Sequence, residues 1–295
     1  MITDDKTDFL YLSNLLAKKK TFFKSFTQLL QDQKVDYGLL PSTKDIWCVD
    51  YMPIQVEHNK FIRFKYQPDY LQNTTYISTQ TDNKQVCEAI GISTHESQIK
   101  IDGGNVIKGN NWVILTDKIF KENPNYTKPE LIDELEHLFE CKVIIIPQEP
   151  GDYTGHADGI VRYYDNDTVL INNYKPNNQP DFQRKLINEL TNNHLGVIKI
   201  PFTPYKNLNR ESADGLYINY LQMNNLIVLP TFNIQEDDVA IRLFEQLFPN
   251  QTLKTIDARD VSKEGGVLNC ITWNIKKVDT LIQISNAPFY NPGQS

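Results

Sequence analysis

The stretch from Trp112 to Ile146 reads WVILTDKIFKENPNYTKPELIDELEHLFECKVIII. Its first four residues and its last four, Val143 to Ile146, are apolar runs with the length and composition of buried strands. Between these runs, Thr127 and Glu130 have the spacing of a capping box, which marks the start of a helix. The apolar positions that follow share one helical face: Leu131, Leu135 and Leu138. The stretch therefore predicts a strand, an amphipathic helix and a second strand.

The same unit recurs on both sides of this stretch. The first strands of the five units are expected at residues 9–12, 61–64, 112–115, 168–171 and 226–229. The second strands are expected at residues 35–40, 98–101, 143–146, 197–200 and 253–256. In the fifth unit the helix is expected to bury Val239, Leu243 and Leu247. The second unit is the least regular, with an extended segment expected at 76–79 and a short helix at 86–90.

Five such units predict a fold built by repetition around an axis. A doubly wound α/β sheet is the competing interpretation, since it also alternates strands and helices. That fold does not predict a regular spacing of polar motifs along the chain. No Pro/Gly/Ser-rich linker or low-complexity segment divides the sequence, so residues 1–295 are interpreted as a single catalytic domain.

Composition narrows the function classes. The chain of 295 residues carries a formal net charge of −7, and its basic residues are dispersed, which argues against nucleic acid as a partner. The four cysteines are widely spaced and form no Cys-x-x-Cys pair. The N-terminus lacks the pattern of a signal peptide, and no apolar run has the length of a membrane span. A cytoplasmic protein without a membrane partner is expected.

A polar cluster follows the closing strand of each unit. One residue from each cluster is spaced about 50 to 65 residues from the next: Asp50, Asn105, His156, Asn219 and Cys270. In a closed ring, equivalent positions of the repeats converge on the axis. Five converging polar groups on an apolar scaffold predict an active site.

The chemistry of these clusters favours a guanidinium substrate. In Gly155-His156-Ala157-Asp158-Gly159, the period of two in an extended segment sends the histidine and the aspartate to one side. Cys270, in a Gly-rich turn, is a candidate nucleophile with His156 as its acid–base partner. The carboxylates of Asp50 and Asp158 match the paired N–H donors of a guanidinium.

Each cluster also has a structural interpretation. Cys270 is compatible with a buried, inert thiol, and Asp50 with a turn or cap residue. Residues 102–105 have the composition of a tight turn, and Trp47 is compatible with a core position. These interpretations do not account for the common spacing.

At these positions the sequence resembles the agmatine deiminase and bacterial-type peptidylarginine deiminase family of guanidine-modifying enzymes. The resemblance runs from about Asp45 to Lys277. Five ordered motifs carry it: Trp47, Asp50 and Pro53; Gly103, Gly104 and Asn105; Gly155, His156 and Asp158; Tyr217, Asn219, Pro230, Thr231 and Phe232; and Gly265, Gly266, Cys270, Ile271 and Thr272.

The resemblance implies a five-bladed α/β propeller with pseudo-fivefold symmetry. It implies that Asp50 and Asp158 hold a guanidinium, that Cys270 attacks its central carbon and that His156 moves the protons through a thiouronium intermediate. A nearby cation, His156 or the substrate, would favour the thiolate. The remaining positions are expected to contact the substrate: Trp47, Gly104, Asn105, Tyr217, Asn219 and Gly266. No metal and no other cofactor is implied, and a homo-oligomer is compatible with the family.

Four positions depart from the family pattern. Val49 stands where the family usually has Arg, and Asn269 where agmatine deiminases usually have His. Val267 replaces one glycine of the Gly-rich turn, and Gly159 leaves no side chain after the carboxylate. All four proposed catalytic groups are nevertheless present.

The sequence thus favours hydrolysis of agmatine to N-carbamoylputrescine and ammonia. A peptidylarginine deiminase that makes citrulline is the enzyme alternative, and the expected absence of a signal peptide favours the small metabolite. A non-catalytic guanidinium-binding protein is the alternative from another class. A papain-like cysteine hydrolase is disfavoured because it has no use for two carboxylates that face the substrate.

Overall fold

Five small sheets make up the framework of the protein in a computed structural model that describes residues 1–174, 180–202 and 212–278. Each sheet has three strands, and its central strand pairs with one neighbour in parallel and with the other in antiparallel register. The sheets are β15 (Thr272–Ile275) with β1 (Phe9–Ser13) and β2 (Asp36–Leu40); β3 (Ile54–Glu57) with β4 (Lys60–Lys65) and β5 (His95–Lys100); β6 (Ile107–Lys108) with β7 (Trp112–Thr116) and β8 (Lys142–Ile146); β9 (Val161–Tyr163) with β10 (Thr168–Asn172) and β11 (Gly196–Ile200); and β12 (Leu221–Met223) with β13 (Leu226–Thr231) and β14 (Thr252–Asp257).

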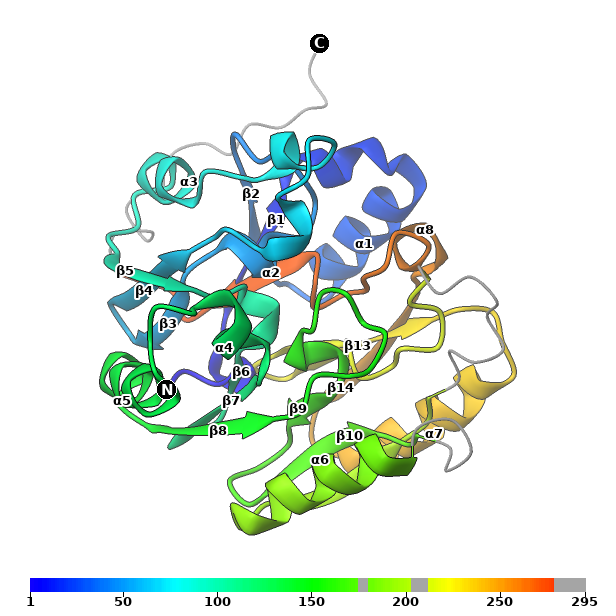
Figure 1. Ribbon diagram of the computed structural model, residues 1–295. Helices are drawn as coiled ribbons and strands as arrows, with labels where there is room; N and C mark the ends of the chain where they lie inside the picture. The colour runs from blue at the N-terminus through cyan, green and yellow to red at the C-terminus, as the bar shows by residue number, and fades with distance from the viewer. Residues whose placement is uncertain (175–179, 203–211, 279–295) are drawn as a thin grey trace.

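Longer helices connect the parallel strands of the sheets and lie towards the outside of the molecule (Figure 1). They are α1 (Lys20–Asp32), α3 (Asn83–Ala89), α5 (Lys128–Phe139), α6 (Pro180–Asn192) and α7 (Glu236–Leu247). Short helices fill the turns: α2 (Cys48–Tyr51), α4 (Lys118–Glu122) and α8 (Arg259–Ser262), with 3-10 turns η1 (Asp4–Lys6), η2 (Asn14–Lys18), η3 (Asp69–Leu71), η4 (Ile77–Thr79), η5 (Gly103–Asn105) and η6 (Ala157–Gly159). In the described part of the chain, every helix is too short or too polar to span a lipid bilayer.

The predicted strand–helix–strand units are confirmed, including the capping box of Thr127 and Glu130 at the start of α5. Two details of the prediction are wrong. The segment 76–79 is not extended but forms the turn η4, because it belongs to a polar connection rather than to a sheet. In α7, Val239 is 47 % exposed, and the buried face carries Ala240 and Phe244 instead.

The core of each unit is formed by the apolar faces that the helices turn towards the strands. In α5, Leu131, Leu135 and Leu138 pack with Val113 and Leu115 of β7 in one buried cluster. This packing sets α5 against its own pair of parallel strands, as the period of its leucines predicts.

We expect Leu135→Ala to lower the free energy of unfolding by about 2–5 kcal/mol, because it leaves a cavity at a fully buried position. Glu134→Ala, at the exposed neighbouring position, is the control and should change stability by no more than about 0.5 kcal/mol. Denaturant unfolding of both variants measures the difference. Equal losses in the two variants would show that this face of α5 is not the packed one.

The antiparallel strand of each sheet determines where the polar clusters lie. Every cluster lies a few residues before such a strand: Asp50 before β3, Asn105 before β6, His156 before β9, Asn219 before β12 and Cys270 before β15. The same local position in five sheets therefore supplies the residues that the sequence spacing singled out.

Candidate functional site

Asp158 is the residue around which the nucleophile segment is arranged. Its Oδ2 atom accepts hydrogen bonds from the side-chain amides of Asn219, at 3.0 Å, and Asn269, at 2.7 Å. The Cys270 thiol lies 3.6 Å from the same oxygen, and the backbone N–H of Cys270 donates to Oδ1 of Asn219 at 3.3 Å. The position at which this chain has Asn269 thus supplies a neutral donor that fixes one oxygen of Asp158.

His156 lies between two carboxylates. Its Nε2 atom is 2.9 Å from Oδ2 of Asp102, and its Nδ1 atom is 3.5 Å from Oδ1 of Asp50. Burial favours the neutral imidazole, but the charge of Asp50 and the hydrogen bond to Asp102 outweigh it and raise the pKa of His156 to about 9. At neutral pH the side chain is therefore an imidazolium that is able to donate a proton.

Asp50 occupies the first turn of α2 and faces the same space as His156. Its Oδ1 accepts a hydrogen bond from the backbone N–H of Gly104 at 3.2 Å. Burial raises the pKa of Asp50 to about 8, although the positive charge of His156 opposes the shift. A cation placed against Asp50 would favour its ionised form, so binding of a cation is coupled to release of the Asp50 proton.

The Cys270 thiol is half-buried, and burial raises its pKa well above the ordinary value. The neighbouring carboxylates of Asp158 and Asp50 add to this shift. The sulfur contacts Asp158, and hydrogen bonds with Asn219 and with the backbone of Val267 oppose the rise in pKa. In the free protein Cys270 is thus held as a thiol, and a cation bound between the two aspartates would supply the missing positive charge.

Gly104 is required by a close approach. A Cβ atom there would lie 2.5 Å from Oδ1 of Asp50 and 2.7 Å from Nδ1 of His156, closer than Cβ atoms come to their neighbours. Gly266 has the same constraint against the ring of Trp47, which is half-buried beside the nucleophile segment. Gly104 therefore leaves space for Asp50 and His156, and Gly266 leaves space for Trp47.

We expect Gly104→Ala to lower kcat by on the order of 10²-fold with little loss of fold, because it displaces Asp50 and His156 by a fraction of an ångström to an ångström. Gly159→Ala is the matched control, since nothing lies within 4 Å of a Cβ atom at that position. Steady-state kinetics of both variants measure the loss of activity, and thermal unfolding of both measures any loss of stability. Retention of full activity in Gly104→Ala would contradict the contact.

Two residues expected to contact the substrate are buried and make contacts within the framework. Asn105 is 2 % exposed, and its Oδ1 accepts the backbone N–H of Thr116 at 2.9 Å. Tyr217 is fully buried; its hydroxyl donates to Asp237 at 2.7 Å and its ring packs on Phe232. The structure places Trp47, Gly104, Asn219 and Gly266 around the four catalytic candidates, whereas Asn105 and Tyr217 support the framework.

Sequence reasoning missed the groups behind His156. Asp102 is predicted only as part of a tight turn. In the structure it is 2 % exposed and accepts a hydrogen bond from His156. The hydroxyl of Tyr70 lies 3.2 Å from the same Asp102 oxygen, and the ammonium of Lys118 lies 3.5 Å from it. A signal existed for Asp102, an acidic residue directly before the Gly-Gly pair, but Tyr70 and Lys118 lie in segments without a motif.

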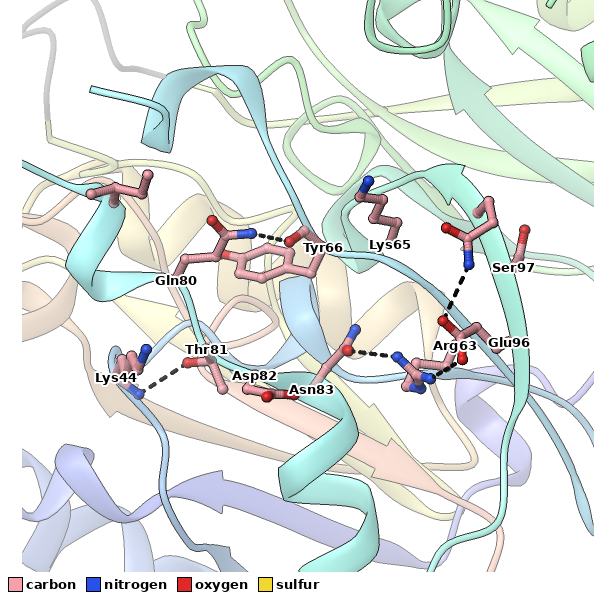
Figure 2. A pocket seen from close by; sticks show the side chains of 12 residues that line it. Lys44, Arg63, Lys65, Tyr66, Gln80, Thr81, Asp82, Asn83, Glu96 and Ser97 are labelled. Atoms are coloured by element: carbon pink, nitrogen blue, oxygen red, sulfur yellow. Dashed lines mark hydrogen bonds and ion pairs between the residues drawn. The ribbon is translucent and has the colours of Figure 1, made fainter. Parts of the chain in front are cut away.

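A hollow of about 420 Å³ lies elsewhere, between β4, β5 and the start of α3 (Figure 2). Arg63 reaches into it and is held by Asn83 at 3.2 Å and Glu96 at 2.8 Å. Of the described residues that line this hollow, none is one of the predicted site residues. Its position therefore does not change the assignment of the site.

The family model for Porphyromonas-type peptidyl-arginine deiminase matches residues 14–275 of this chain. The chain belongs to this family. The match spans all five polar clusters, and it confirms the resemblance that the motifs indicated.

Curated proteins similar to this chain are named as agmatine deiminases. A Streptomyces avermitilis protein named "Putative agmatine deiminase" is 28 % identical over 208 residues, 63 % of this chain and 60 % of that protein. A Mycoplasma mycoides protein of the same name is 26 % identical over 223 residues, with 64 % and 61 % covered. The chain thus spans about three fifths of the length of the curated relatives it matches.

Solved structures show the same fold. The C. jejuni agmatine deiminase superposes with a TM-score of 0.76 at 16 % identity, over 94 % of this chain and 96 % of that one. The agmatine deiminase of Enterococcus faecalis gives a TM-score of 0.70 at 14 % identity, over 93 % and 94 %. At these identities the likeness concerns the fold alone: a mixed α/β fold like that of agmatine deiminases.

Proposed function

We propose that this deiminase-family chain hydrolyses a guanidinium compound to a ureido product and ammonia, with agmatine as the first candidate substrate. The observation that carries the proposal is that Cys270 lies against Asp158 and His156 against Asp50, with the charges of both aspartates acting on the thiol. A planar guanidinium is the cation that such a pair of carboxylates suits, because its N–H donors match both. We further infer that the five sheets are the blades of a propeller whose axis passes through this site.

In the first half of the reaction, Cys270 forms a bond to the central carbon of the guanidinium. The bound cation lowers the proton affinity of the thiol, since it offsets the charges of Asp158 and Asp50 that raise the pKa of Cys270, and the thiol releases its proton to water as the cation binds. The His156 imidazolium then donates its proton to one nitrogen, the C–N bond breaks and ammonia leaves. The product of this half is a thiouronium on Cys270 and a neutral His156.

In the second half, neutral His156 accepts a proton from a water molecule that attacks the same carbon. The C–S bond breaks, the departing thiolate takes the remaining hydroxyl proton of the product, and the ureido product leaves. Cys270 is then again a thiol and His156 again an imidazolium. Asp102 keeps the imidazole oriented through both halves, since it holds Nε2 while Nδ1 faces Asp50.

Incubation with agmatine and with an arginine-terminated peptide tests the proposal, with ammonia and ureido product as readouts. Turnover of agmatine supports it, and turnover of the peptide alone assigns the peptidylarginine activity instead. If no guanidine releases more ammonia with wild type than with Cys270→Ala, the enzyme assignment fails. Calorimetric binding of agmatine without turnover would then identify a guanidinium-binding protein.

A further inference from the structure

A buried lysine lies behind the acid–base pair. Lys118, on α4, has a side chain only 3 % exposed, and its ammonium forms ion pairs with Asp102 at 3.5 Å and Glu122 at 3.3 Å. It also lies 3.7 Å from Asp69 and 4.6 Å from the centre of the Tyr70 ring. A buried ammonium is costly unless anions lie close to it, and three carboxylates lie within 4 Å of this one.

The backbone is shaped to accommodate this lysine. Gly155, the first residue of the Gly-His-x-Asp motif, has a φ of +64°, and a Cβ atom there would lie 2.8 Å from Cδ of Lys118. The stem of Lys118 thus packs directly beneath the motif that carries His156. Its position is fixed relative to the imidazole, unlike that of a surface lysine.

Lys118 and His156 share one carboxylate. Three groups lie close to Oδ2 of Asp102: Nε2 of His156 at 2.9 Å, the Tyr70 hydroxyl at 3.2 Å and the Lys118 ammonium at 3.5 Å. The charged and titratable groups that face His156 are therefore Asp50 from α2, Asp102, Tyr70 from η3 and Lys118 from α4. Lys118 is the cation in this set, and it opposes protonation of the imidazole.

We propose that Lys118 is a positioning residue that sets the pH range of the reaction by limiting the proton affinity of His156 through Asp102. His156 must be protonated to release ammonia and neutral to activate water, so an excess of negative charge would stop the second half. Lys118 neutralises part of the charge of Asp102, Glu122 and Asp69, which lets the imidazole lose its proton. This inference rests on the proposed function for its catalytic consequence but not for its titration.

Lys118→Met tests the proposal, because methionine keeps the length of the stem and removes the charge. The midpoint of His156, followed by NMR on histidine-labelled protein and assigned with His156→Asn, is expected to rise by about one pH unit. In turnover, the acidic limb of the pH profile of kcat should move to higher pH by the same amount. A larger share of the protein should also carry the covalent adduct on Cys270 at steady state. Lys118→Arg should restore both readouts.

Lys121→Met is the matched control, since Lys121 lies on the same helix, pairs with the same Asp69 at 2.6 Å and is 76 % exposed. It removes the same charge from the protein and should leave the His156 midpoint where it is. If Lys118→Met does not fold, Lys118→Gln provides the same uncharged comparison. A midpoint that moves no further in the Lys118 variant than in Lys121→Met overturns the proposal. If wild type turns over no guanidine, the proposed function fails, and the titration still decides the role of Lys118.

Discussion

Cys270→Ala is expected to lower the rate of ammonia release by on the order of 10⁴- to 10⁶-fold, the effect of removing a nucleophile from a unit of catalytic groups. The physical reason is that the sulfur forms the only bond between protein and substrate in the proposed reaction. Asp50 and Asp158 remain in this variant, so agmatine should still bind. Ammonia release and calorimetry on the same preparation measure the two properties.

Cys141→Ala provides the control for the loss of a thiol. Like Cys270, Cys141 is a half-buried free cysteine, but it lies beside β8 and packs against the cluster around α5. Its loss should leave turnover unchanged. Mass spectrometry of wild type during turnover should also show an adduct on Cys270, and an adduct on any other cysteine would contradict the proposed nucleophile.

Asp102→Asn is expected to reduce kcat by on the order of 10²- to 10³-fold at neutral pH, within the range of a general acid–base contribution. Asp102 is one of two carboxylates that raise the pKa of His156 to about 9. Removing an anion destabilises the imidazolium, so the pKa of His156 falls and less of it is protonated at neutral pH. The alkaline limb of the pH profile should therefore move to lower pH, and the loss of activity should grow as pH rises.

Asp69→Asn is the control that separates the lowered pKa of His156 from the general loss of a carboxylate near Lys118. Asp69 also contacts Lys118, at 3.7 Å, but it is more than a third exposed and makes no hydrogen bond to His156 among the described residues. Its pH profile should stay close to that of wild type. Thermal unfolding of both variants shows whether either change acts through stability, and an identical shift in the two profiles would contradict the role given to Asp102.

Much of the site was predictable because the fold repeats. The apolar runs show which segments are strands and helices, and the polar residues that interrupt the pattern recur at one place in each unit. Asp50, His156 and Cys270 are predicted in this way, and Asp158 from its spacing of two from His156, without any contact being known. Their mutual geometry follows from the equivalence of their positions before β3, β9 and β15.

The rest depended on contacts that spacing does not encode. The antiparallel strands were missed because β6, β9 and β12 have only two or three residues, too few to show a period. Tyr217 carries a motif position yet points at Asp237, which only the packing of α7 decides. Lys118, on α4, and Asp102, just before η5, meet although neither lies in a strand, so neither residue alone signals the pair.

The pairing of β15 with β1 has a consequence for biosynthesis. Phe9 pairs with Ile275, so the sheet that contains β1 and β2 lacks its third strand until the ribosome has released residues near 275. Cys270 lies directly before that strand, and its carbonyl accepts the backbone N–H of Val49 at 3.4 Å. Cys270 therefore reaches Asp158 only when β15 docks, and a nascent chain that ends before β15 holds the carboxylates without the thiol.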